Sequence, residues 1–448
     1  MNDLFAARSQ MALSLGFHII FSCIGMVMPF FMAVAHFYWL KTGNIVFRNV
    51  TKAWSKGVAI FFATGAVSGT VLSFELGLLW PRFMKHAGPI FGMPFSLEGT
   101  AFFIEAIALG MFLYGWGRFN KWFHWITGII VGVSGLVSGI LVVAANSWMN
   151  SPSGFDYVNG QYLNIDPIKA MFNKAWFSQA LHMSLAAFVA TGFAVAGIHA
   201  LMLLKGKNME FHNKAFRIAA VFAAVAALLQ PLSGDISAKD VAVRQPAKLA
   251  AMEAHFKTEK AASFVIGGIP DTKTKEVNYG IKIPGLLSFL AHGDFNAEVK
   301  GLDQVPEPDH PPVMVAHMAF QIMIGLGVFM MLVAVIYFIV LWRQKWKWIN
   351  RRWLLKLFVI ATPMGFLAVE AGWTVTEVGR QPWIIYQVMR TKDAVTPMPG
   401  ISYSFAVFTA VYLSLALVVT FMLYRQIRMV GKLYDLPASV PEPLNPHP

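Results

Sequence analysis

The chain has 448 residues, of which 56% are hydrophobic and only 13% charged, and its formal net charge at pH 7 is +13. Its apolar residues lie in runs much longer than the core helices of soluble proteins need, which places the chain in the membrane class. The basic residues are expected in loops that face anionic lipid, so nucleic acid is not expected as a partner. The only cysteine, Cys23, lies inside the first apolar run. An internal disulfide, a Cys-ligated iron–sulfur cluster and a covalent c-type haem are therefore excluded.

Nine apolar segments are long enough to cross a hydrocarbon core of about 30 Å as helices, which takes about 20 residues each. The alternation of a membrane β-barrel is absent, and no internal repeat is evident. In chain order the segments are 13–40, 57–79, 95–117, 126–146, 178–204, 218–232, 312–342, 354–373 and 403–424. The first is too long for a signal peptide and has no small-residue cleavage site. We therefore expect an all-α polytopic membrane protein built from helical bundles.

The loops between these segments alternate in character, and this predicts the orientation in the membrane. Short loops rich in Lys and Arg follow the first, third, fifth and seventh segments and the last one, and such loops belong in the cytoplasm. The other loops are longer and less basic, so the N-terminus is expected outside and the C-terminus inside. We divide the chain into helices one to six (1–232), an outer loop (233–311), helices seven to nine (312–424) and a cytoplasmic tail (425–448). The outer loop is far longer than ordinary connections, and its apolar stretches favour an ordered, functional segment.

Ionisable groups inside spans need a reason, because each costs about 2.5–3.5 kcal/mol at a helix centre on insertion scales. The polar or sulfur-bearing candidates, nearly all on the outer side of the membrane, are His18, Glu98, Glu105, His182, Met323, Glu370 and Glu377. Taken singly, each has an ordinary explanation: Met323 as a core methionine, either histidine as an interhelical hydrogen-bonding group, and Glu98 or Glu377 as a partner of Arg82 or Arg380. Their shared depth favours a common site.

Two imidazoles, a thioether and carboxylates at one depth are a plausible set of axial groups for haem iron. A His/Met pair suits a low-spin electron-transfer haem, and a site with an open position suits oxygen. Buried Glu and His also serve proton-coupled transporters, which forms the main alternative class. That class predicts inverted repeats and broken helices near mid-membrane, and the sequence shows neither.

A family resemblance extends over most of the chain. The segment 369–383 reads VEAGWTVTEVGRQPW, and its GRQPW part is highly specific. Supporting stretches in the same order are GFHIIF at His18, SLEGTAFFIEA at Glu98 and Glu105, GWGR at 115–118, AANSWMNSP at 144–152, KLAAMEA at 248–254 and AFQIM ending at Met323. The chain resembles the haem-bearing large subunit, subunit I, of bacterial cytochrome bd quinol oxidases, in the form with a short quinol loop.

The resemblance implies a role for each candidate. His182 and Met323 would ligate a low-spin haem b, and His18 and Glu377 would jointly serve a high-spin pair of haem b and haem d. Glu98 would be a second ligand or proton acceptor beside that pair. Arg380, Trp373 and Arg8 would surround the haems, with the arginines available to propionates. Lys248 and Glu253 would belong to the quinol site, although a Lys and a Glu at this spacing alone predict an ordinary solvated helix face.

The implied reaction is oxidation of a membrane quinol near the outer face, coupled to reduction of O2 to water. Protons for oxygen would come from the cytoplasm, with Glu105 and Asn146 as a relay, so that charge is separated without a pump. The implied partners are subunit II and small single-helix subunits in the bacterial cytoplasmic membrane. A quinol-oxidising haem b protein that does not reduce O2 stays open. One departure is Gln321, which stands where the family often has Arg.

Overall fold

The computed structural model describes residues 2–158, 161–207, 209–344 and 351–434. In this part of the chain nine helical segments are long and apolar enough to cross a membrane, which confirms the predicted class. They are α1 (Asp3–Thr42), α2 (Ile45–Leu79), α3 (Pro81–Tyr114), α4 (Lys121–Asn150), α6 (Trp176–Leu204), α7 (Met209–Arg244), α10 (Val313–Gln344), α11 (Arg352–Ala361) with α12 (Met364–Val378), and α14 (Ile401–Tyr434).

Capping residues explain where several of these helices turn. Gly43 adopts a φ of 67° after α1, and Asn44 then caps α2 by accepting a hydrogen bond from the Val46 amide at 2.9 Å. Asn120 caps α4 in the same way. Pro363, which lacks an N–H, stands at the break between α11 and α12, so the eighth span is broken near its middle, where the sequence analysis expected no broken helix. The tight turn at Gly43 makes α1 and α2 antiparallel neighbours.

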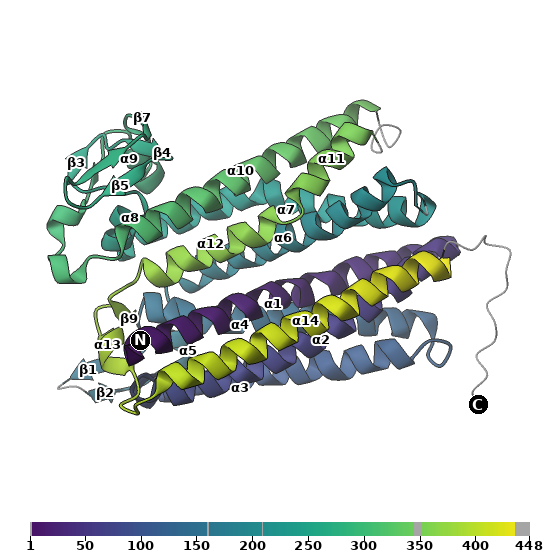
Figure 1. Ribbon diagram of the computed structural model, residues 1–448, viewed down its shortest axis with the longest axis horizontal. Coiled ribbons are helices and arrows are strands. Elements are labelled where there is room, and N and C mark those ends of the chain that lie inside the picture. The colour runs from purple at the N-terminus through teal and green to yellow at the C-terminus, as the bar shows by residue number, and fades with distance from the viewer. Residues whose placement is uncertain (1, 159–160, 208, 345–350, 435–448) are drawn as a thin grey trace.

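The membrane helices form two bundles, which Figure 1 shows as two layers of long, nearly aligned helices. In the first bundle α1 packs on α2 and α4, α3 packs on α4 and α2, and α14 packs on α1 and α2. In the second bundle α6, α7, α10 and α12 pack in that cyclic order, because α12 also packs on α6. Helices α6 and α10 therefore lie diagonally across the second bundle. The two bundles meet mainly where α6 packs on α1 and α4 and where α7 packs on α2, and α12 also touches α1.

Small residues let the helices of the second bundle approach closely. A Cβ atom placed on Gly192 of α6 would lie 2.8 Å from Cα of Ala223 in α7. Alanines of these two helices, among them Ala187, Ala196 and Ala220, are fully buried in the main core. Close backbone approach of this kind is the usual basis of helix packing in membranes, where burial of apolar surface drives little.

Short elements gather at the end of the molecule where α1 begins (Figure 1). Between α4 and α6 lie β1 (Asp156–Val158), β2 (Gln161–Leu163) and α5 (Pro167–Met171). The outer loop contains α8 (Pro246–Met252), β3 (Glu259–Lys260), β4 (Phe264–Ile266), β5 (Ile269–Asp271), β6 (Glu276–Asn278), β7 (Ile281–Ile283), α9 (Leu286–His292), β8 (Glu298–Val299), η1 (Leu302–Gln304) and η2 (Glu307–Asp309). After α12 follow β9 (Trp383–Ile385), β10 (Met389–Arg390) and α13 (Thr391–Ala394).

The outer loop is an ordered cap, as its apolar stretches predict. Its strands pair antiparallel as β3–β8, β4–β7 and β5–β6, with Phe264 opposite Ile283. Leu249, Phe264 and Leu287 are buried in a small core that also includes Phe320 of α10. Helix α7 continues to Arg244, beyond the predicted span end at residue 232. Of the predicted tail, residues 435–448 lie outside the described residues.

Candidate redox site

His182 lies on α6 and faces α7 inside the second bundle. Its Nδ1 is 3.0 Å from the Ser233 hydroxyl, which donates its own proton to the Gln230 carbonyl at 2.8 Å. The hydroxyl oxygen must therefore accept from Nδ1–H, which leaves the lone pair of the imidazole on Nε2. The next residue, Gly234, is so close that a Cβ there would lie 3.7 Å from Cε1 of His182. The imidazole is oriented as a metal-ligating histidine requires.

His18 of α1 is held by the same arrangement on α2. Its Nδ1 is 2.9 Å from the hydroxyl of Ser68, and that hydroxyl donates to the Thr64 carbonyl at 2.9 Å. A Cβ on Gly69 would lie 3.1 Å from Cε1 of the ring. The lone pair again falls on Nε2, which accepts from the Ser22 hydroxyl one turn along the same helix at 2.9 Å. A Ser-Gly pair on the facing helix thus sets the tautomer of each histidine and leaves room for its ring.

Met323 lies on α10, diagonally across the second bundle from the helix of His182. Its sulfur lies against α12, where a Cβ on Gly372 would be only 2.9 Å from Sδ. Both side chains are half-buried inside the bundle. Nε2 of His182 accepts from Nε2 of Gln230 at 3.2 Å, so Gln230 also holds this ring. An imidazole nitrogen and a thioether sulfur from two diagonal helices are the types of group that would hold the iron of one haem.

Glu377 lies at the end of α12 and reaches the first bundle. Its Oε2 accepts from Nη2 of Arg380 at 2.6 Å, and its Oε1 accepts from Nδ2 of Asn146 in α4 at 2.5 Å. Each oxygen keeps a second lone pair for a metal. Nε and Nη1 of Arg380, which is 2% exposed, and Nε1 of Trp373 are buried without a partner among the described residues. Buried donors without partners beside a carboxylate suit a haem and its propionates, whereas Arg8 is exposed at the outer end of α1.

Helix α12 connects the candidate sites of the two bundles. Gly372 touches Met323, Trp373 follows it, and Glu377 comes one turn later. One turn earlier, the Glu370 carboxylate lies beside α1, where a Cβ on Gly16 would be 3.1 Å from its Oε2. Gly16 is two residues from His18. One helix therefore passes both candidate haem sites.

Glu98 and Glu105 lie on the face of α3 that packs against α4. Ser138 donates to Oε1 of Glu98 at 3.0 Å, so the partner of this carboxylate is a hydroxyl of α4 and not Arg82. Glu105 is 7% exposed, and a Cβ on Gly135 would lie 3.2 Å from its carboxylate oxygens. Farther along α4, toward the outer face, lies Asn146. Polar groups thus follow the α3–α4 contact toward Glu377.

Lys248 and Glu253 at the two ends of α8 are both buried, each with 4% exposure, so the solvated-face interpretation is wrong. Nζ of Lys248 donates to Oδ1 of Asn150 at 2.6 Å. Burial and the nearby Arg380 guanidinium lower the pKa of Lys248, and Glu377 opposes them. Burial raises the pKa of Glu253 to about 8, and its Oε2 has no partner among the described residues. Glu253 can therefore take up or release a proton near neutral pH.

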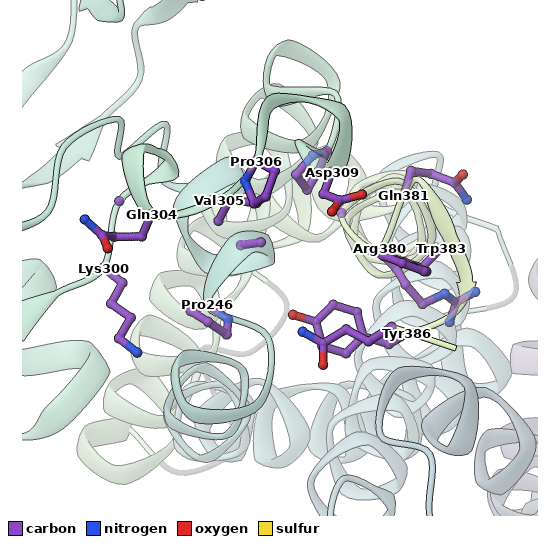
Figure 2. A pocket seen from close by; sticks show the side chains of 15 residues that line it. Pro246, Lys300, Gln304, Val305, Pro306, Asp309, Arg380, Gln381, Trp383 and Tyr386 are labelled. Carbon is purple, nitrogen blue, oxygen red and sulfur yellow. The ribbon is translucent and has the colours of Figure 1, made fainter. Parts of the chain in front are cut away.

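A pocket of about 310 Å³ opens beside the start of α8. Figure 2 shows Lys300 and Gln304 on one side of it and Arg380, Gln381 and Trp383 of the GRQPW segment on the other. The lining includes Ala247 but neither Lys248 nor Glu253. The pocket gives the outer surface access to the neighbourhood of Arg380.

Two side chains of α10 fasten the outer loop above Met323. His317 is fully buried, with Nδ1 3.0 Å from the Met252 carbonyl and Nε2 3.1 Å from the Gly267 carbonyl. Gln321 accepts from the Gly267 amide and donates to the Val265 carbonyl, both at 2.9 Å. Gln321, where the family often has Arg, thus binds backbone of the loop instead of supplying a charge.

Several polar partners of the site residues are not predictable from the sequence near those residues. Ser68 and Ser233 lie on the second helix of each contact, so no pattern near the histidines points to them. Asn150 follows Asn146 by one turn within the AANSWMNSP stretch, which was the available signal. Glu75 of α2 is fully buried and accepts from Gln10 at 2.9 Å, and its own Oε2 has no partner among the described residues. The signal for Glu75 was its place as an ionisable residue inside the second apolar segment, as for Glu98 in the third.

The fold and the site together define a membrane protein with two helical bundles, each holding a half-buried histidine that is hydrogen-bonded to a serine of the facing helix. Comparison with known proteins gives its family. Residues 6–430 match the family model for cytochrome bd terminal oxidase subunit I, and the chain belongs to this family.

Curated relatives and a solved structure agree with this assignment. A Bacillus subtilis (strain 168) protein named as subunit I of a cytochrome bd menaquinol oxidase is 35% identical over 428 residues, which is 94% of this chain and 96% of the relative. A cytochrome bd ubiquinol oxidase subunit 1 of the same strain is 31% identical over 461 residues, with 100% and 98% covered. The bd oxidase structure from Geobacillus thermodenitrificans superposes with a TM-score of 0.90 at 36% identity and covers 96% of this chain and 99% of that one.

Proposed function

We propose that this chain is the haem-bearing large subunit of a quinol:O2 oxidoreductase that oxidises quinol at the outer face of the membrane. The observation that supports it most directly is the pair of histidines, His18 and His182, each with its lone pair fixed on Nε2 by a serine. Relatives named as menaquinol and ubiquinol oxidases support quinol as the electron donor.

Three haems would be held by this chain. His182 and Met323 would bind a low-spin haem b, while His18 and Glu377 would jointly serve a high-spin haem b and a haem d, with Glu98 beside them. The bound haems would supply electron transfer and the reduction of O2 to water. Arg380 offers a propionate two nitrogens, Nε and Nη1, that have no partner among the described residues, and Arg8 is a second cation for the same purpose. Trp373, whose Nε1 is also buried without a partner among those residues, would lie beside the haems.

The quinol site is proposed at α8. Glu253 adjoins Met252, whose carbonyl is bound by His317, and His317 is six residues from Met323 on α10. The carboxylate at this end of α8 is therefore close to the low-spin site and would accept a quinol proton. Lys248, at the other end of α8, belongs to the same proposed quinol site, and its Nζ donates to Oδ1 of Asn150.

Protons for oxygen are proposed to reach the high-spin site along the α3–α4 contact. Glu105 is the deepest carboxylate there, and Glu98, Ser138 and Asn146 continue the polar row outward. Because quinol protons leave on the outer side, charge would be separated without a pump. Glu105→Gln should lower the rate of O2 reduction about tenfold or more, since the amide cannot carry a proton. A rate undiminished at every pH would remove Glu105 from the relay.

The assembly is proposed to sit in the bacterial cytoplasmic membrane with subunit II and small single-helix subunits. Helix α14 supports this arrangement, because it is little buried and exposes Tyr403 (80%), Leu417 (73%) and Phe421 (63%). Apolar faces of this kind contact either lipid or further transmembrane helices.

An optical spectrum of the purified complex, with O2 consumption driven by added quinol, tests the proposal. We expect b-type and d-type haem bands and quinol-dependent O2 uptake. Protein without haem bands would favour a transporter, and b-type bands without a d-type band or O2 uptake would favour a quinol-oxidising haem b protein.

A further inference from the structure

The outer loop carries exposed apolar side chains on the ladder formed by β4 and β7. In that ladder Ile266 of β4 stands opposite Ile281 of β7, and the two are 47% and 68% exposed. Ile283, two residues farther along β7, points to the same face and is also exposed. Ile269 follows at the start of β5 and is exposed as well. We call these four side chains the isoleucine group.

The surface of the outer loop is not apolar throughout. The turn between β5 and β6 reads DTKTKE from Asp271 to Glu276, and its side chains from Thr272 onward are exposed to solvent. Single exposed apolar residues are ordinary in proteins, but neighbours that form a patch usually mark a contact with protein or membrane. A polar turn beside an apolar face is typical of a segment at a membrane surface.

Helix α10 determines how deep this part of the loop lies. Gln321 binds the amide of Gly267 and the carbonyl of Val265, and His317 contacts the Gly267 carbonyl. These two side chains stand about 6 and 12 Å along the helix axis from its start at Val313. The end of β4 is therefore attached to the side of a membrane helix and not above it. Figure 1 shows β4 and β7 beside the first part of α10, away from the first bundle.

The surface of α10 next to this attachment is exposed and apolar. Met314 and Met318 precede His317 and Gln321 by three residues each, so each methionine is a surface neighbour of a residue that holds the loop. Both methionines are exposed, as is Ile322 one turn after Met318. Exposed apolar side chains of a helix that crosses the membrane contact lipid or another transmembrane helix. The isoleucine group thus lies next to a membrane-facing surface.

We propose that the isoleucine group is immersed in the outer leaflet of the bilayer, so that the ladder of β4 and β7 contacts lipid. The two strands satisfy each other's backbone groups, which immersion requires. A ladder of two strands also has outer edges that need water or headgroups, so the immersion is limited to the interfacial layer. The inference goes beyond the proposed function, because it requires neither haem nor quinol.

Charge does not account for this contact. Segment 264–284 carries three lysines and two carboxylates, so its charge is nearly balanced: Lys273, Lys275, Lys282, Asp271 and Glu276. A segment held by anionic headgroups would be expected to carry a cluster of basic residues. Apolar burial is the remaining driving force, so the contact should form equally with zwitterionic and anionic lipid.

The test uses the purified complex in phosphatidylcholine nanodiscs, with an environment-sensitive fluorophore attached to Ile281→Cys. Thr272→Cys, in the polar turn of the same loop, is the matched control, and the buried Cys23 adds little labelling. We expect the label at position 281 to be quenched by lipids with a nitroxide on the acyl chain. It should also be at least about threefold less accessible to iodide than the label at position 272. Added phosphatidylglycerol should change neither result.

Three results would overturn the inference. Equal quenching by iodide at positions 281 and 272, with none by nitroxide lipid, would place the isoleucine group in water. Protection from both quenchers would show that a protein surface, such as the helix of a small subunit, covers it. Quenching by nitroxide lipid only when phosphatidylglycerol is present would replace the apolar contact with a charge contact.

A second labelling position keeps the test decisive if Ile281→Cys does not assemble. Ile266→Cys lies on the paired strand, and the same outcomes apply to it. A parent complex with no haem bands and no quinol-driven O2 uptake would refute the proposed function and leave the labelling result valid. The two failures are therefore distinguishable.

Discussion

Each proposed histidine ligand depends on one serine of the facing helix. The hydroxyls of Ser68 and Ser233 donate hydrogen bonds to backbone carbonyls. Their oxygens therefore accept hydrogen bonds from Nδ1–H of His18 and His182. Such an acceptor raises the electron density of the imidazole and favours the ferric state of a bound iron.

Ser233→Ala should therefore raise the midpoint potential of the low-spin haem. The expected rise is a few tens of millivolts, the equivalent of a net hydrogen bond of about 1 kcal/mol. Redox titration of the low-spin band measures it, with Ser68→Ala as the control that leaves this band in place. A lowered potential would contradict the assigned tautomer.

Met323→Leu should convert the low-spin haem to a high-spin form or abolish its signal, because leucine has no lone pair for iron. The bands of the pair at His18 and Glu377 should persist. Optical and paramagnetic resonance spectra of the complex measure both. An unchanged low-spin signal would remove Met323 from the ligand set.

Glu253 should make the stability of the outer loop depend on pH. Its pKa is raised to about 8 in the fold, from the ordinary 4.5. The fold therefore prefers the protonated form, and the contribution is fully present below the ordinary pKa and is lost as pH rises toward 8. Each pH unit in this window should lower the free energy of unfolding by about 1.4 kcal/mol.

Hydrogen exchange of segment 245–311 in the complex, corrected for the intrinsic effect of pH, measures this dependence. We expect protection to fall between about pH 5 and about pH 7 in the parent, and Glu253→Gln to remove that fall. The same slope in both proteins would show that Glu253 is not the titrating group.

At the scale of elements, the contact between α6 and α7 depends on the lack of a side chain at one position. Gly192→Ala would place a methyl group 2.8 Å from Cα and Cβ of Ala223, and neither backbone can yield cheaply. We expect a loss of about 1–3 kcal/mol, visible as a lower melting temperature of the detergent-solubilised complex. Gly110→Ala is the control, because a Cβ there has no atom of the chain within 4 Å. Equal melting of the parent and Gly192→Ala would contradict close packing at this contact.

At the scale of the whole molecule, the prediction concerns which end faces the cytoplasm. Cys23 is 4% exposed, so the parent provides a background with little labelling. Thr272→Cys in the outer loop should react with a membrane-impermeant maleimide in intact cells, and Arg118→Cys between α3 and α4 should react only after permeabilisation. The reverse pattern would invert the topology.

The sequence by itself determined the class of protein, the nine spans and the family. Length and hydropathy suffice for the spans, because the hydrocarbon core imposes one helix length on every crossing. It also indicated His18, His182 and Glu377 as candidates, since polar groups inside spans are few, and the family resemblance adds Met323 to the proposed ligands.

Only the tertiary structure decided which groups meet. The serine partners of the histidines and the hydrogen bonds from Lys248 through Asn150 to Glu377 join residues of different helices. The burial of Glu253 likewise depends on how separate elements pack. Lys248 and Glu253 show the reason most clearly: their spacing on α8 predicts a solvated face, and only packing of the loop against α4 and α10 removes them from water. Periodicity specifies one helix at a time, whereas a hydrogen-bond network between helices depends on the register in which they pack.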